Sequence, residues 1–232
     1  MADLAAKSLL VLAIDTCGAA GSVALGRLSA PPGLEGRCSN GSSIEILGQI
    51  ELDGRSYSEK LMTVVKDILG GNGIKLRDVG CIVAVNGPGS FTGVRVGLST
   101  VKGFAMSVRM PVVAISRLAV LSGKAQVNAA ALDAHRGEVF LRGVGGELLA
   151  GADEFAEITA PERIAVCDEA AAKVLRAAWP ETELVNVTAP TAADALVQAA
   201  SRVLAGDFVE LALLDGNYLR RPDAEIHFGA SA

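Results

Sequence analysis

The chain has 232 residues, of which 50% are apolar, and it carries a formal net charge of -5. This length allows one large domain or two small ones, with a core built from Ala, Val, Leu and Ile because only 4% of the residues are aromatic. Lys and Arg form no cluster, which argues against a protein that binds nucleic acid by itself, since phosphate neutralisation dominates that affinity.

Strands and helices alternate in the first half of the chain. Strands are expected at 9–14, 22–27 and 44–52, with a loop rich in Pro, Gly and Ser before the third. Apolar residues at helical spacing then predict a helix over 57–69, which a glycine-rich segment ends. A strand at 81–86, a glycine-rich turn, a helix over 92–108 and a strand at 112–115 follow.

The second half is richer in Ala and continues the alternation. Segments 127–134 and 138–144 flank His-Arg-Gly and predict a hairpin. Further expected elements are strands at 163–167 and 183–187, a helix near 168–178, and a helix at 191–205 with Thr191 as N-cap. The pattern indicates an α/β fold with a first subdomain at 1–107 and a smaller second one at 108–232. An alternative assignment places the helix at 191–205 in the first subdomain.

Leader, membrane and disulfide signals are weak. The apolar run Leu9–Ile14 is short and Asp15 follows at once, so it is expected to be a strand and not a signal peptide. No run approaches the ~18 apolar residues that a membrane span needs. The four cysteines are scattered without a C-x-x-C pair, which is typical of a reducing compartment. A soluble, cytoplasmic protein without a membrane partner is therefore expected.

The stretch VAVNGPGSFTGVRVG, residues 83–97, combines a strand, a glycine-rich turn and a helix start. This geometry presents backbone N–H groups to an anion. Thr92 stands where a P-loop and a dinucleotide fingerprint both need glycine, so neither phosphate motif is complete. The alternative is a tight turn into a helix capped by Ser90 or Thr92. Gly93 and Gly97 lie on one helix face, where another backbone can approach closely.

Five segments carry a family resemblance. They are LAIDTCGAAGSVAL, YSEKLMTVVKDIL, NGPGSFTGVRVGLSTVKGFA, LDAHRGEVF and NYLRRPDAE. Together they resemble the TsaB family, also called YeaZ, over most of the chain. Two departures stand out: Tyr57 replaces the usual His, and the loop at 28–43 is longer than expected.

The resemblance implies an α/β fold of the actin-like ATPase type (sugar kinase/Hsp70/actin, ribonuclease H-like) with two subdomains. It implies a non-catalytic role in forming threonylcarbamoyladenosine in tRNA, next to the anticodon. The implied partners are a TsaD-type transferase subunit, a TsaE-type ATPase and a second copy of the chain. The chain then reaches tRNA only through the complex.

The residues agree with a non-catalytic subunit. Transferase relatives carry an H-x-x-x-H metal pair, whereas the two histidines here, His135 and His227, are far apart, so no metal site and no catalytic residue is assigned. One alternative is an actin-like ATPase or kinase that holds ATP and Mg weakly at a vestigial or interface site. Its candidate residues are Asp15, Thr16, Gly87 and Gly89. A glycoprotease-like peptidase is less favoured, although a Ser–His–Asp triad can form across space.

The helix at 57–69 and its glycine-bearing neighbour are predicted to build a partner interface. The first has apolar residues around more of its circumference than one core-facing stripe requires. The candidate interface residues are Tyr57, Glu59, Leu61, Met62, Val65, Gly93, Val94, Gly97, Leu98 and Val101. The competing interpretation is that both helices only cover the sheet of one monomer.

Overall fold

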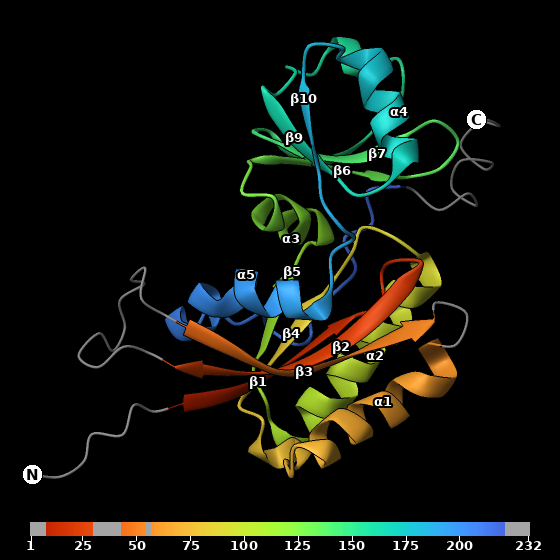
Figure 1. Cartoon of the computed structure of the whole chain (residues 1–232). Helices are drawn as coiled ribbons and strands as arrows, with labels where there is room; N and C mark the ends of the chain where they lie inside the picture. The colour runs from red at the N-terminus through yellow and green to blue at the C-terminus, as the bar shows by residue number, and fades with distance from the viewer. Residues whose placement is uncertain (1–7, 30–42, 54–56, 221–232) are drawn as a thin grey trace, which may run out of the picture. The chain divides into compact units, whose positions relative to one another are not determined.

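The computed structural model describes residues 8–29, 43–53 and 57–220. The long loop noted at 28–43, His227 and the end of the NYLRRPDAE segment fall largely or wholly outside these residues. The chain divides into two compact units (Figure 1). Unit 1 comprises Met1–Val120 and Pro190–Gly216, and unit 2 comprises Leu121–Ala189 and Asn217–Ala232.

Unit 1 is built on a five-stranded sheet of order β3-β2-β1-β4-β5. Its strands are β1 (Ser8–Asp15), β2 (Ala20–Ser29), β3 (Ser43–Asp53), β4 (Cys81–Val85) and β5 (Val112–Ile115). The first three pair antiparallel, while β4 and β5 continue the sheet parallel to β1. All five residues of β4 are buried, which is why this strand is a continuous apolar run and not an alternating one.

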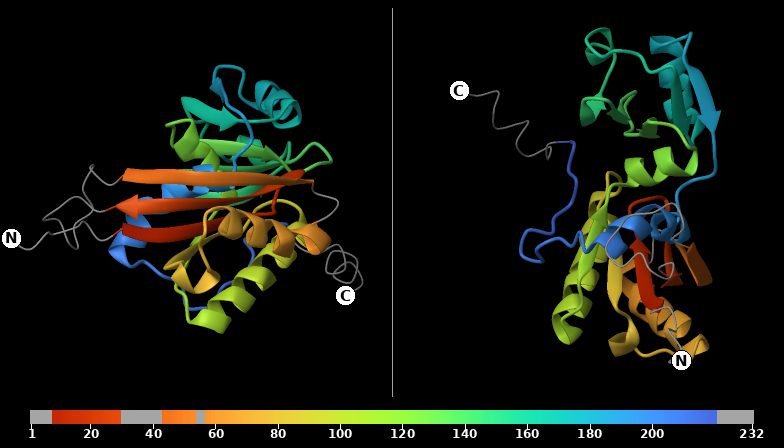
Figure 2. Two further views of the ribbon diagram at one scale, coloured as in Figure 1. Left: turned by 60° about the horizontal axis from the view of Figure 1, so that its bottom comes forward. Right: turned by 90° about the vertical axis from the view of Figure 1, so that its left-hand side faces the viewer.

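Helices cover both faces of this sheet (Figures 1 and 2). On one face lie α1 (Tyr57–Gly71) and α2 (Phe91–Val108), and on the other lies α5 (Ala192–Ala205). The side chain of Thr191 accepts a hydrogen bond from the Asp194 N–H and completes a capping box with it, which confirms the expected start of α5. Because α5 packs on this sheet, it belongs to unit 1, although the segment Leu121–Ala189 of unit 2 precedes it in the chain.

Unit 2 contains a second five-stranded sheet, of order β10-β9-β6-β7-β8. Its strands are β6 (Ala129–Asp133), β7 (Val139–Gly143), β8 (Gly146–Ala150), β9 (Arg163–Val166) and β10 (Glu183–Asn186). The helix α4 (Glu169–Ala178) packs on β6 and β9, and Asp168 caps it by accepting from the Ala171 N–H at 2.7 Å. The rings of Phe155 and Trp179 meet edge to face at 4.9 Å within the small core.

The α/β interpretation is confirmed, with differences in detail. The structure adds a helix α3 (Arg117–Lys124), two short 3₁₀ turns η2 (Leu76–Asp78) and η3 (Glu154–Ala156), and the strand β8. The division between the units lies after Val120 and not near 107, because β5 continues the sheet of unit 1. Among the described residues, no helix is long and apolar enough to cross a membrane.

Candidate functional site

The glycine-rich stretch after β4 packs against the turn that follows β1. We call this turn the β1–β2 turn; it comprises Asp15, Thr16, Cys17 and Gly18. Because β1 and β4 are parallel neighbours, their carboxyl ends meet at one edge of the sheet. The Ser90 N–H donates to the Cys17 carbonyl at 2.8 Å, and the Thr16 hydroxyl donates to the Gly93 carbonyl at 2.7 Å. The start of α2 is thereby bound to the β1–β2 turn.

Close approach of the β1–β2 turn explains Gly93 and Gly97 on α2. A Cβ atom on Gly93 would collide with the backbone carbonyl oxygen of Thr16, and one on Gly97 would collide with its hydroxyl oxygen. A Cβ on Gly89 would likewise collide with the Cys17 carbonyl oxygen. The close approach expected from the sequence therefore exists, but the approaching backbone is the chain's own β1–β2 turn.

A buried ion pair lies at the same corner. Asp15 is 1% exposed, and its Oδ1 accepts from the Cys17 N–H at 2.8 Å. Its Oδ2 lies 3.4 Å from Nε of Arg117, whose side chain is 10% exposed. Both oxygens of the Asp15 carboxylate thus have partners inside unit 1. Breaking such a buried pair leaves an uncompensated charge in the core.

The four residues proposed for a weak nucleotide site are brought together here, and Asp15, Thr16 and Gly87 each have a polar partner within the chain. The Thr16 hydroxyl donates to the Gly93 carbonyl, and the Gly87 carbonyl accepts a hydrogen bond from the Arg117 N–H at 2.6 Å. An incoming cation would have to displace the Arg117 guanidinium from Asp15. Nucleotide binding at this corner remains a prediction.

Tyr57, the first residue of α1, also contacts the β1–β2 turn. Its hydroxyl donates to the Gly18 carbonyl at 2.7 Å. Burial raises the pKa of Tyr57 to about 12, and the nearby Asp15 charge adds to this shift. Burial, with a further contribution from Asp15, also raises the pKa of the Cys17 thiol well above its ordinary value. Both groups therefore stay protonated near neutral pH, and Tyr57 acts as a hydrogen-bond donor.

Most of the residues predicted for the partner interface lie in the core of unit 1. The buried ones are Tyr57, Leu61, Val65, Gly93, Val94, Gly97, Leu98 and Val101. The physical reason is that α1 and α2 direct their apolar faces at the sheet, as the competing interpretation stated. These side chains therefore pack within unit 1, and the partner interface itself stays a prediction.

The outward faces of α1 and α2 carry other residues. Glu59 and Met62 are exposed, and Met62 is 57% accessible. On α2, Phe91 and Met106 are exposed, and the Arg95 guanidinium lies 3.8 Å from the centre of the Phe91 ring. Sequence analysis missed these exposed α2 residues.

In unit 2, His135 lies at the tip of the β6–β7 hairpin, where its Nδ1 is 2.9 Å from Oδ2 of Asp133. No serine or cysteine completes a triad with this pair among the described residues. Within the same residues, no group of three or more His, Cys, Asp and Glu side chains is arranged to hold a metal ion.

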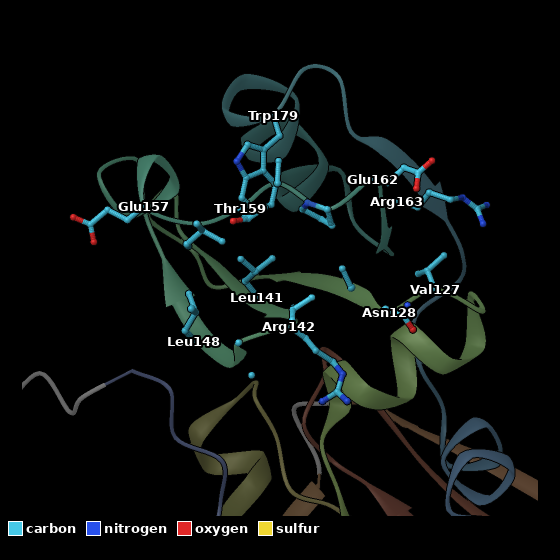
Figure 3. A pocket seen from close by; sticks show the side chains of 18 of the residues that line it. Val127, Asn128, Leu141, Arg142, Leu148, Glu157, Thr159, Glu162, Arg163 and Trp179 are labelled. Carbon is cyan, nitrogen blue, oxygen red and sulfur yellow. The ribbon is translucent and has the colours of Figure 1, made fainter.

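Unit 2 also contains a cavity of about 700 Å³ (Figure 3). Leu141 and Trp179 face it from opposite sides, while the carboxylate of Glu157 points outward. Ile158 and Pro161 add to its apolar wall. Such a cavity suits an apolar group. Sequence analysis did not predict this cavity.

Comparison with known proteins adds independent information. Residues 49–147 match the family model of TsaD, tRNA N6-adenosine threonylcarbamoyltransferase. The tRNA threonylcarbamoyladenosine biosynthesis protein TsaB of Escherichia coli is 33% identical over 136 residues, which cover 56% of this chain and 52% of that protein. TsaB of Haemophilus influenzae is 32% identical over 140 residues, covering 58% and 53%. The chain thus matches about half the length of these curated relatives.

Two solved structures from Pseudomonas aeruginosa share the fold along nearly the whole chain. One is described as an uncharacterized protein with similarity to peptidase YEAZ; it is 26% identical, has a TM-score of 0.67, and aligns over 91% of this chain and 100% of that one. The other, YeaZ, is 26% identical with a TM-score of 0.61 and the same coverage. The expected actin-like ATPase, ribonuclease H-like fold class is confirmed.

Proposed function

Because the chain belongs to the TsaB/YeaZ family, we propose that it is the non-catalytic partner of a TsaD-type transferase. The reaction of this complex is the formation of threonylcarbamoyladenosine in tRNA, next to the anticodon. The main support is the match to TsaB relatives, together with the match of residues 49–147 to the transferase family model. The two kinds of protein therefore resemble each other over the part of unit 1 that contains α1 and α2.

The outward faces of α1 and α2 are the proposed contact with the transferase. Met62, Phe91 and Met106 give this surface exposed apolar area, and Glu59 and Arg95 give it charge. A likeness between the two subunits in this region supports face-to-face packing of similar helix pairs. By the same reasoning, a second copy of the chain can occupy the face as a homodimer, and a TsaE-type ATPase joins the assembled pair.

The buried corner at Asp15 supports the absence of independent catalysis. Its carboxylate already accepts a backbone N–H and faces Arg117, so the free chain is proposed to bind Mg-ATP weakly or not at all. With a net charge of -5, the chain is also proposed to reach tRNA only within the complex, in the cytoplasm. No observation favours the kinase or peptidase alternatives over this function.

The proposal is tested by co-purifying the chain with the TsaD-type subunit of the same organism and assaying tRNA modification with each subunit omitted. We expect a stable complex, and modification that requires the transferase and is strongly reduced without this chain. Efficient transfer by this chain alone would contradict the non-catalytic role. Failure to form any complex with the transferase would contradict the partnership itself.

A further inference from the structure

The β6–β7 hairpin ends in an unusual turn that the proposed function does not use. Three successive residues, His135, Arg136 and Gly137, have positive φ values of 63°, 58° and 80°. Two of them carry side chains, for which this left-handed conformation is strained. The His135 side chain is 86% exposed and Arg136 is also exposed. Consecutive strained residues persist only where the surrounding structure fixes them, and they are concentrated at ligand-contacting sites.

The turn is held from within the hairpin by Asp133. Its Oδ1 accepts from the His135 N–H at 2.8 Å, and its Oδ2 lies 2.9 Å from Nδ1 of the same residue. The backbone closes around this pair, because the Ala134 N–H donates to the Glu138 carbonyl at 3.0 Å and the Glu138 N–H donates to the His135 carbonyl at 3.1 Å. The imidazole ring is therefore held by Asp133 at Nδ1, while the side chain as a whole remains 86% exposed.

A second support comes from the end of the described chain. Nη2 of Arg220 donates to the Ala134 carbonyl at 2.7 Å and also binds the Glu138 carboxylate, 82 residues away in sequence. Nearby, the Asp168 carboxylate caps α4 and accepts from the Asp133 N–H at 3.3 Å. The carboxylates around the turn are thus engaged in ion pairs or caps. The exposed side chains at the tip of the turn are those of His135 and Arg136.

We propose that the His135–Arg136 turn contacts single-stranded RNA, namely unpaired nucleotides of the tRNA that the complex modifies; this rests on the function proposed above. Unpaired bases are recognised by stacking on the planes of His or Arg side chains, while Arg also pairs with phosphate oxygens. A fixed turn offers both planes without an ordering cost on binding. Because the chain as a whole is acidic, this contact adds to RNA binding by the complex and does not replace it.

The test uses the double variant His135→Asn, Arg136→Asn in the assembled complex. Asn tolerates the left-handed backbone, so the ring and the charge are removed while the turn is kept. The matched control is Arg109→Asn, because Arg109 is also an exposed arginine with a positive φ, of 54°, but it lies in unit 1. Assembly with the transferase is checked by size-exclusion chromatography, and affinity for an unmodified tRNA transcript is then measured at several salt concentrations.

We expect the double variant to assemble normally and to bind the tRNA about 10-fold more weakly, as for loss of one stacking contact. The slope of log K against log salt should become less steep by about 1, as for loss of one phosphate contact. The Arg109→Asn complex should match the wild type. Unchanged affinity and slope would overturn the inference, and so would a loss of assembly, which would make the turn a protein contact.

Crosslinking separates this inference from the proposed function. An anticodon stem-loop containing 4-thiouridine is irradiated with the complex and with the free chain. Crosslinks within residues 133–138 support the RNA contact even if no complex with the transferase forms, in which case only the proposed function fails. Absence of such crosslinks in both samples overturns the RNA contact whatever the state of assembly.

Discussion

Replacing Arg117 with Met should destabilise unit 1 strongly. The substitution removes the guanidinium that faces Oδ2 of Asp15 at 3.4 Å and leaves a carboxylate that is 1% exposed without its charged partner. Breaking a buried pair in this way costs about 3 to 5 kcal/mol of unfolding free energy. The long distance favours the lower end, about 3 kcal/mol, because a charge-assisted hydrogen bond of full strength is shorter.

The double variant Asp15→Asn, Arg117→Met distinguishes this cause from a loss of packing. Each single change leaves one buried charge, whereas the double change leaves none. If the losses of unfolding free energy caused by Asp15→Asn and by Arg117→Met were independent, they would sum to about 6 kcal/mol in the double variant. We expect the double variant to lose about 3 kcal/mol of unfolding free energy or less. The matched control is Arg163→Met, which breaks an exposed pair with Glu183 and should cost no more than about 1 kcal/mol.

The measurement is urea unfolding followed by far-UV circular dichroism, with unfolding free energies taken from the transition of unit 1. A loss below about 1 kcal/mol for Arg117→Met would refute the argument that Asp15 depends on this cation. Strict additivity of the two single changes would refute it as well, since it would show that the two side chains do not interact.

Three further predictions concern unit 1. Gly97→Ala should cost about 1 to 3 kcal/mol of unfolding free energy by overpacking against the Thr16 hydroxyl. Thr16→Ala should relieve this cost in a double variant but should not relieve the cost of Gly93→Ala, whose new Cβ meets the Thr16 backbone; urea unfolding of the three single and two double variants tests this. Tyr57→Phe should lose about 1 kcal/mol with its hydrogen bond. The pKa of Tyr57 is raised from 10.0 to about 12, so folding favours the neutral phenol. The unfolding free energy of the wild type should therefore fall as pH rises from about 10 to about 12, and the Phe variant should lack this decline. Met62→Glu should weaken transferase binding about 10-fold or more. The melting temperature should not fall, because Met62 is exposed. Unchanged affinity in a pull-down titration would mean that the interface lies elsewhere.

Local patterns in the sequence were sufficient for most elements of the fold. The helical spacing of Leu61, Val65 and Ile68 predicted α1, and the alternation of strand and helix predicted the α/β class. The short helix α3 was missed because its eight residues follow β5 after a single serine, which leaves little room for a periodic signal. The same brevity hid β8, a strand of five residues.

The site was harder to predict because its contacts are distant in sequence. Thr16 and Gly93 are 77 residues apart, and Asp15 and Arg117 are 102 apart. The pair Gly93 and Gly97 does indicate a close approach, but a one-dimensional pattern cannot tell whether the approaching chain is a partner or the protein itself. An apolar helix face has the same ambiguity, and for α1 the sheet of unit 1 is what covers it.

The return of α5 to unit 1 has a consequence for biosynthesis. The Ala192 N–H donates to the Ser22 hydroxyl at 2.8 Å, across 170 residues of chain. One face of the first sheet therefore stays uncovered during synthesis until α5, which ends at Ala205, has been made. The second sheet is complete once β10 has been synthesised, at Asn186. The sheet of unit 2 can therefore form on the ribosome while the apolar face of unit 1 is still uncovered, although the segment from Asn217 joins unit 2 only later. A chain released before α5 emerges would expose that face of unit 1 to aggregation.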